Sequence, residues 1–162
     1  MILIVGGVSG VGKSTIGVLL SRALDLPFYD ADDFHPAANI EKMASGQPLD
    51  EGDRLPWLEA LADHLASWEK QGGAVLACSA LRESYRETLG SRCREPVTWI
   101  MLSGSRELLS ARLAARQGHF FDPSLLDSQL ADLELPADGR VFDVQPPPGE
   151  IVDAILEQLR GD

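Results

Sequence analysis

The fold is decided by the stretch Gly7-Val8-Ser9-Gly10-Val11-Gly12-Lys13-Ser14. It fits the pattern G-x-x-x-x-G-K-[S/T] without adjustment, and it lies between the apolar run Ile2–Val5 and a helical pattern. In this setting the glycines allow backbone N–H groups to face phosphate oxygens, and the helix start adds its positive dipole. The alternative is an ordinary glycine-rich turn before a helix. The agreement of strand, motif and helix favours a loop that binds nucleotide phosphates.

Apolar runs alternate with helical patterns along the rest of the chain. After Ile2–Val5, strands are expected at Leu26–Tyr29, Ala74–Cys78, Val97–Leu102 and Val141–Val144. Helices are expected at Lys13–Leu24, Asn39–Ala44, between Pro56 and Gly72, at Arg106–Arg116, at 125–133 and at 151–159. Strands that are apolar throughout indicate a parallel sheet covered by helices on both faces. The sequence therefore predicts an α/β three-layer sandwich with a five-stranded parallel sheet, as one domain over residues 1–162.

The bulk properties limit the classes of function. The chain has 162 residues and a net charge of −11, which argues against a general role on nucleic acids or membrane surfaces. Its longest apolar runs are too short to span a bilayer, and the N-terminus shows no signal peptide. The two cysteines, Cys78 and Cys93, suggest neither a metal site nor a disulfide framework. A cytoplasmic location is the expectation.

Two absences narrow the class of nucleotide-binding protein. No N-K-x-D element that reads guanine is present, and the third expected strand ends in Cys78-Ser79 rather than in an acid. A small kinase for a metabolite or nucleotide remains. Lys13 is expected to reach the β- and γ-phosphates of ATP, and Ser14 to ligate Mg²⁺. Thr15 is also expected to contact the bound ATP, through its hydroxyl or its backbone.

The segment YDADDFHP, residues 29–36, crowds acids just after the second expected strand. Ligands of open parallel sheets bind outside the carboxyl ends of the strands, so these acids share an edge with the phosphate loop. Asp30 is expected to hold Mg²⁺ through water, and Asp32 to orient or deprotonate the acceptor hydroxyl. The alternative is an exposed acidic turn that bonds to its own backbone.

Several separated blocks together resemble the gluconokinase family, whose wider relatives are the shikimate and nucleoside monophosphate kinases. The blocks are GVSGVGKST, DADDFHPAANIEKMASGQPLDEGDRLPWL, CSALRESYRETL and RLAARQGHFFDPSLLDSQLADLELP. The resemblance implies the nucleoside monophosphate kinase-like P-loop fold with a mobile lid, here about residues 117–133. It also implies the reaction of ATP with D-gluconate to give ADP and 6-phosphogluconate, with Mg²⁺. A homodimer is possible, because dimers are common in such families.

The resemblance also implies roles for individual residues. The loop from Gly7 to Thr15 is the ATP phosphate site. The acceptor site would be formed by Asp32, His35, Arg54, Ser79, Arg82, Arg86 and His119. Arg112 would contact ATP and Arg116 would stabilise the transition state, although which arginine meets adenine and which the phosphates stays open. Surface ion pairs are the alternative for Arg54, and pairing with Glu83 or Glu87 for Arg82 and Arg86.

Two positions depart from the family pattern near the expected acceptor site. Ala31 stands where the family usually has glycine between two acids, and Gly52 interrupts an acidic run. Two rival functions therefore stay open beside gluconokinase. One is a related kinase for shikimate or another sugar acid. The other is a nucleotide-binding regulatory module without turnover.

Overall fold

The computed structural model describes residues 1–115, 123–137 and 140–161. Its five strands are all parallel and run in the order β2-β3-β1-β4-β5. The strands are β1 (Ile2–Gly6), β2 (Phe28–Asp30), β3 (Ala74–Ala77), β4 (Thr98–Ser103) and β5 (Arg140–Asp143). The predicted fold class, a three-layer sandwich around a five-stranded parallel sheet, is confirmed.

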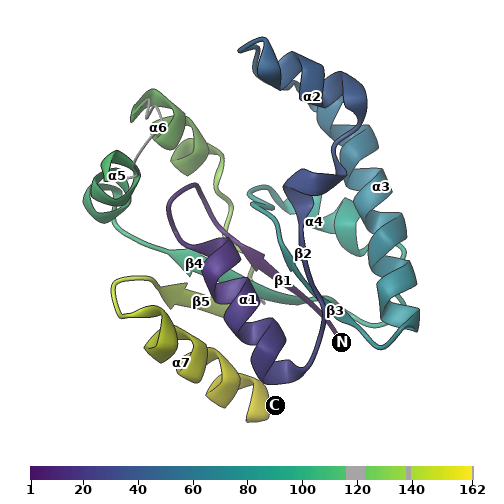
Figure 1. The fold of residues 1–162 in the computed structure, drawn as a ribbon, viewed down its shortest axis with the longest axis vertical. Helices are drawn as coiled ribbons and strands as arrows, with labels where there is room; N and C mark the ends of the chain where they lie inside the picture. Colours follow the sequence, from purple (N-terminus) through teal and green to yellow (C-terminus); the bar gives the residue numbers. More distant parts are fainter. Residues whose placement is uncertain (116–122, 138–139, 162) are drawn as a thin grey trace.

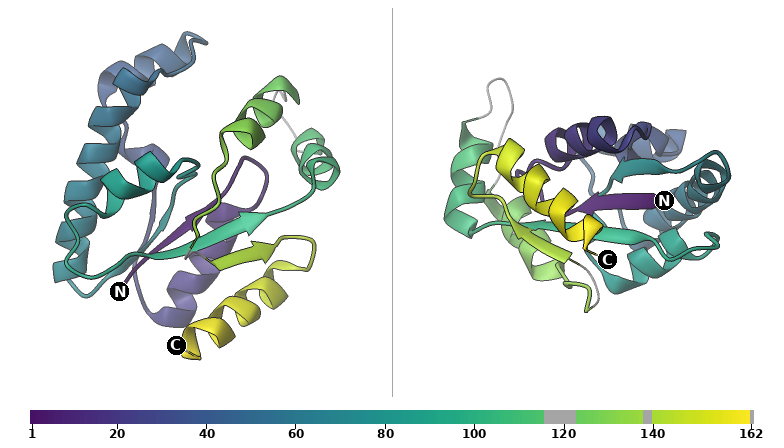
Figure 2. Two further views of the ribbon diagram at one scale, coloured as in Figure 1. Left: turned by 180° about the vertical axis from the view of Figure 1, so that it is seen from behind. Right: turned by 90° about the horizontal axis from the view of Figure 1, so that it is seen from below.

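Helices connect the strands and cover both faces of the sheet (Figures 1 and 2). They are α1 (Lys13–Leu24), α2 (Ala37–Ala44), α3 (Glu51–Lys70), α4 (Glu83–Gly90), α5 (Arg106–Ala114), α6 (Pro123–Asp132) and α7 (Pro148–Arg160), with a 3-10 turn η1 at Ala31–Phe34. Among the residues that the structure describes, no helix has both the length and the apolar character needed to cross a membrane.

The core is divided between the two faces because successive strand residues point in opposite directions. Leu3 and Val5 of β1 pack in a cluster with residues of α1, α5 and α7. Ile2 and Ile4 pack in a second cluster with residues of α3 and α4. All four of these β1 side chains are buried, as an apolar run between two helical layers requires.

The carboxyl ends of the strands carry the loops that position the site. β1 lies between β3 and β4; the chain leaves its carboxyl end for β2 on one side of the sheet, and it later crosses from β3 to β4 on the other side. Figure 1 shows α2 and α3 rising on one side and α5 and α6 on the other, with the loop from β1 to α1 between them. Crevices at such a position bind ligands in open α/β sheets.

The start of α3 differs from the expectation. Asp50 caps this helix by accepting from the Asp53 N–H at 2.8 Å, while the Asp53 carboxylate accepts from the Asp50 N–H at 2.9 Å. This reciprocal capping box starts the helix at Glu51, well before Pro56. Arg54 therefore lies in the first turns of α3, although the sequence placed this helix only between Pro56 and Gly72.

Candidate active site

The phosphate loop joins β1 to α1. Gly10 and Gly12 have φ angles of 90° and 91°, a region that side chains with a Cβ rarely adopt. No side-chain hydrogen bond from the N-cap residue Gly12 closes the start of α1, whose positive dipole end lies at this turn. Lys13 Nζ donates to the carbonyl of Val8 at 3.2 Å. Such a loop presents donors and a positive charge to an anion.

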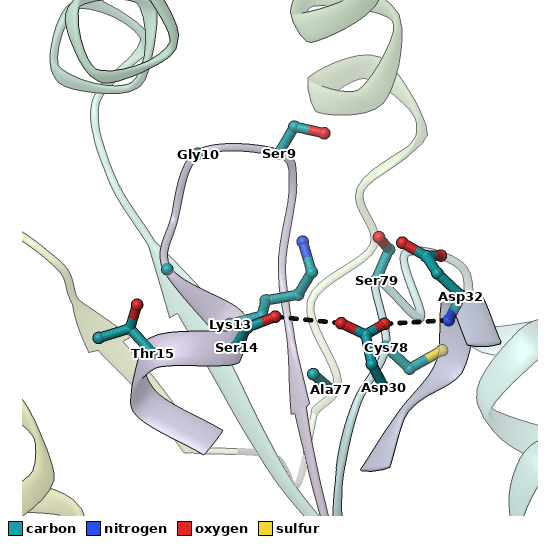
Figure 3. Close-up of a pocket in the computed structure, with 11 residues that line it drawn as sticks. Ser9, Gly10, Lys13, Ser14, Thr15, Asp30, Asp32, Ala77, Cys78 and Ser79 are labelled. Carbon is teal, nitrogen blue, oxygen red and sulfur yellow. Dashed lines mark hydrogen bonds between the residues drawn. The ribbon is translucent and has the colours of Figure 1, made fainter. Parts of the chain in front are cut away.

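Asp30, the last residue of β2, and Asp32, in the turn that follows it, face this loop (Figure 3). Ser14 Oγ donates to Asp30 Oδ2 at 3.2 Å, and Asp30 Oδ1 accepts from the Asp32 N–H at 3.0 Å. The second bond caps the turn η1 and places Asp32 just beyond β2. Lys13, Ser14, Asp30 and Asp32 thus line one cavity of about 270 Å³, here called the phosphate pocket, together with Ser79.

The pKa of Asp32 lies above its ordinary value. Loss of solvation in the pocket is the main cause, and the nearby Asp30 carboxylate adds to it, while His35 and Lys13 act in the opposite direction. The Asp32 side chain is still 86% exposed, so solvent moderates the rise. A carboxylate with a raised pKa is a better proton acceptor than an ordinary aspartate.

The oxygen donors suit Mg²⁺, although no dense cluster of acids surrounds them. Within the described part of the chain, no three His, Cys, Asp or Glu side chains are grouped as a metal centre. Mg²⁺ commonly keeps several waters and takes only one or two protein ligands beside substrate phosphates. The hydroxyl of Ser14 and the carboxylate of Asp30 fit that requirement.

A second cavity, here called the acceptor pocket, adjoins the phosphate pocket. Cys78 and Ser79 line both cavities. The volume of the acceptor pocket is about 230 Å³, smaller than the roughly 300–1,000 Å³ of pockets for drug-sized ligands. Its polar and charged lining residues are His35, Arg54, Tyr85, Ser128, Gln129 and Asp132, with Ser79 at the shared wall. The size and lining suit a small polar metabolite.

His35 is held in place in the wall of this pocket. Its ring stacks on Trp57 with a centroid separation of 4.2 Å, and its Nδ1 lies 3.2 Å from the amide nitrogen of Asn39. An amide N–H only donates, so Nδ1 accepts and the neutral ring carries its proton on Nε2. Burial lowers the pKa of His35, which favours this neutral form. Nε2 lies 4.0 Å from Asp32 Oδ1.

The rim of the acceptor pocket carries a charged network from three helices. Tyr85 Oη donates to Glu51 Oε1 at 2.7 Å, and Arg54 reaches the Tyr85 hydroxyl at 3.4 Å. Arg82 binds Asp132 at 2.6 Å and lies 3.5 Å from the same Glu51 oxygen. The structure thus brings Arg54 and Arg82 together around Glu51, which also lies 3.6 Å from Arg54 and forms with it the surface ion pair expected as the alternative. Arg82 pairs with Glu51 and Asp132 rather than with Glu83 or Glu87, and it is absent from the lining of the acceptor pocket.

Arg86 occupies a different place from the one expected of a substrate ligand. Its side chain is 2% exposed, and its guanidinium donates to the carbonyls of Ala80 at 2.7 Å and of Glu134 at 2.6 Å. It also pairs with Glu83 at 2.8 Å, which was the alternative to a substrate role. Arg86 is absent from the lining of the acceptor pocket. It supports the loop that forms the wall shared with the phosphate pocket.

The nucleotide side of the site contains a third cavity of about 260 Å³, next to the phosphate loop. Arg112 lines it together with Pro146, and the Arg112 guanidinium donates to the Val144 carbonyl at 2.6 Å. This position is compatible with a contact to ATP. Arg116 and His119, and the first part of the expected lid at 117–133, lie outside the described residues; its remainder includes α6.

Sequence reasoning missed four residues that shape the acceptor pocket: Trp57, Tyr85, Gln129 and Asp132. Trp57 fixes the turn after β2, because its Nε1 donates to the Ala31 carbonyl at 2.9 Å. Gln129 accepts from the Ser9 N–H at 2.7 Å. All four stand in the family-like blocks DRLPWL, SYRETL and SQLADLELP, so the blocks pointed to them although no role had been assigned.

Comparison with known proteins identifies the family of the chain. The family model "Shikimate kinase" matches residues 9–159. A gluconokinase of Gluconobacter oxydans is 45% identical over 162 residues, with 97% of this chain and 88% of that protein covered. A probable gluconokinase of Dictyostelium discoideum is 40% identical over 99% of this chain and 86% of that protein. The crystal structure of a gluconokinase from Sinorhizobium meliloti superposes with a TM-score of 0.87 at 40% identity, covering 98% of this chain and 92% of that one. The chain belongs to the gluconokinase family, within the wider group of kinases that the shikimate kinase model describes.

Proposed function

We propose that this protein is a gluconokinase, which transfers the terminal phosphoryl group of ATP to D-gluconate and forms ADP and 6-phosphogluconate. One observation carries the proposal: the acceptor pocket and the phosphate pocket share the wall formed by Cys78 and Ser79. A hydroxyl held in the first pocket can therefore reach a phosphoryl group held in the second. Phosphoryl transfer depends chiefly on such in-line positioning and on stabilisation of charge.

The ATP side of the reaction uses the loop from Gly7 to Thr15. Its backbone N–H groups bind the phosphates, and Lys13 neutralises charge on the transferred group. Ser14, and Asp30 through water, would hold Mg²⁺, which would supply a further positive charge to the phosphates. Arg112 contacts the nucleotide beside the loop, and Arg116 stabilises the transition state.

The acceptor side offers partners for both parts of an aldonic acid. Arg54 and Arg82 present guanidinium groups to the carboxylate, and Arg54 can do so as a two-pronged donor. Asp32 accepts the proton of the attacking hydroxyl, while the Nε2 donor of His35 and the Ser79 side chain contact other hydroxyls. His119 is included in the proposed acceptor site because of the family resemblance.

A cytoplasmic location and a homodimer stay predictions.

The deciding experiment is an ADP-release assay with Mg²⁺ and ATP over a panel of acceptors. The panel contains D-gluconate, other aldonic acids, shikimate and nucleoside monophosphates. We expect strong turnover with D-gluconate and phosphorylation at its terminal hydroxyl, identified by NMR. Lys13→Ala should abolish this turnover, because the contact with the β- and γ-phosphates is lost. An active Lys13→Ala protein would contradict the assignment of the phosphate loop.

The panel also separates the rival functions. Turnover with shikimate or another acid would keep the kinase chemistry and attribute the change of acceptor to Ala31 and Gly52, the two departures from the family pattern. Release of ADP without a phosphorylated product would indicate hydrolysis rather than transfer. Tight binding of ATP without turnover on any acceptor would favour a regulatory module.

A further inference from the structure

Gln129 links α6 to the phosphate loop. Its Oε1 accepts a hydrogen bond from the Ser9 N–H at 2.7 Å, although the two residues are 120 positions apart in the sequence. Ser9 lines the phosphate pocket, whereas Gln129 lines the acceptor pocket. The Gln129 side chain is therefore at the boundary between the two cavities, on the path between phosphate donor and acceptor.

The Ser9 N–H belongs to the group of donors that a phosphate loop offers to ATP. In the structure this donor is already satisfied by an amide oxygen, so a phosphate oxygen that binds there must take the place of Gln129. The orientation of the amide follows from the contact, because a backbone N–H can only donate and Oε1 must accept. The amide nitrogen of Gln129 is then the hydrogen-bond donor of this side chain.

The backbone that carries Gln129 is fixed on the acceptor side. Asp132, three residues later, binds Arg82 at 2.6 Å. The Glu134 N–H then donates to the Leu81 carbonyl at 2.7 Å, and the Glu134 carbonyl accepts from the buried Arg86. With this support, the side chain of Gln129 can change its partner by rotating about its own bonds, without displacement of α6.

We propose that Gln129 is a catalytic residue that exchanges partners: its oxygen accepts from Ser9 in the empty site, and its amide N–H donates to the terminal phosphoryl group of ATP during transfer. The terminal group is the one concerned because Gln129 lies on the side that faces the acceptor pocket. A glutamine can serve both states because its side chain both accepts and donates, whereas an ionised glutamate only accepts. This inference rests on the proposed kinase function and adds a contact to it.

The test compares Gln129→Glu with the wild-type protein. Glutamate keeps the shape and the bond to Ser9, but it repels the phosphoryl group and cannot donate to it. We expect ATP binding, measured by calorimetry, to weaken about 10-fold or more relative to ADP binding, because ADP lacks the terminal group. With D-gluconate, kcat should fall about 10²-fold, the usual effect of removing one donor to developing charge.

Gln158→Glu is the matched control, because it makes the same chemical change on the exposed part of α7, away from both pockets. It should bind both nucleotides as the wild type does. Gln129→Ala provides a second route if the glutamate variant does not fold, as judged by its melting curve. The alanine variant should bind ADP as tightly as the wild type and still lose about 10²-fold in kcat.

Two results would overturn the inference. One is an equal loss of ATP and ADP affinity in Gln129→Glu, which would mean that the side chain only supports the loop. The other is a wild-type kcat in Gln129→Ala. The comparison of ATP with ADP involves no acceptor, so it decides the role of Gln129 even if D-gluconate proves not to be the substrate.

Discussion

Ser14 and Asp30 are hydrogen-bonded across the site, with Ser14 Oγ 3.2 Å from Asp30 Oδ2, although one residue lies in the first turn of α1 and the other ends β2. The contact follows from the sheet order, because β2 and β1 both flank β3 and end at the same edge. A hydroxyl and a carboxylate at this distance are ready-made oxygen ligands for a hard cation. Asp30 thereby offers the carboxylate that the end of β3 lacks, because that strand leads into Cys78 and Ser79 rather than into an acid.

Asp30→Asn tests the role of this pair in holding Mg²⁺. The amide keeps the shape of the side chain but removes the charge that attracts the cation and its waters. We expect the Mg²⁺ concentration for half-maximal activity to rise about 10–100-fold, measured by titrating Mg²⁺ at saturating ATP. Asp33→Asn, a nearby acid outside the lining of the phosphate pocket, is the control and should leave this value unchanged. An unaltered Mg²⁺ requirement in Asp30→Asn would rule out the assignment.

Asp32→Asn tests the proposed base. An amide cannot accept the proton of the acceptor hydroxyl in the way that a carboxylate does, so kcat should fall about 10²–10⁴-fold. Steady-state kinetics with varied D-gluconate separates this effect from binding. A rise in KM at an unchanged kcat would instead identify Asp32 as a residue that only holds the substrate.

The pH dependence of kcat/KM gives a second prediction for Asp32. Its pKa is raised above the ordinary aspartate value because of lost solvation and the charge of Asp30. Since the base acts in its ionised form, activity should fall with decreasing pH and should begin to fall above the range of an ordinary aspartate, about 3.9. The acid limb should vanish from the residual activity of Asp32→Asn. If the limb persists there, another group causes it.

Arg54→Lys tests recognition of the substrate carboxylate. Lysine keeps the charge but loses the planar pair of donors, so D-gluconate should bind about 10–100-fold more weakly by calorimetry. Arg92→Lys is the control, because Arg92 pairs with Asp63 at 2.9 Å on the surface. Equal D-gluconate affinity in wild type and Arg54→Lys would leave Arg54 as a partner of Tyr85 and Glu51 alone.

The elements that the sequence predicted best are those with a local cause. The phosphate loop and α1 follow from the glycines and Lys13, and β1, β3 and β4 follow from apolar runs that two helical layers must bury. The start of α3 was predicted too late, because the capping box of Asp50 and Asp53 outweighs the signal of Pro56. The sequence patterns thus predicted the five strands and most of the helices, but they gave no helix at α4 and placed the start of α3 too late.

The contacts across the site depend on tertiary structure and could not be inferred from spacing. Arg82 and Arg86 are four residues apart, a spacing that puts two side chains on one face when a single helix contains both. Arg82 is instead the N-cap residue of α4 and turns toward Asp132, while Arg86 is buried against carbonyls. The bond from Ser9 to Gln129 joins two segments whose proximity only the folded chain creates.

Arg86→Ala tests whether this buried guanidinium supports the site rather than contacts the substrate. Ala80 has a φ of 45°, an uncommon value for a residue with a Cβ, and its carbonyl is one of those that Arg86 binds. Loss of the guanidinium leaves buried carbonyls unpaired, so the free energy of unfolding should fall by about 2–4 kcal/mol. Urea denaturation measures this change. Because the Ala80 loop lines the acceptor pocket, the KM for D-gluconate should rise as well.

Arg92→Ala, which removes an exposed arginine after α4, is the control and should change the free energy of unfolding by no more than about 0.5 kcal/mol. Arg86→Lys adds a discriminating case. Lysine retains a positive charge but cannot reach the Ala80 and Glu134 carbonyls together, so a supporting role predicts a loss of stability close to that of Arg86→Ala. A wild-type unfolding curve for both Arg86 variants, together with weakened binding of D-gluconate, would instead restore Arg86 to the acceptor site.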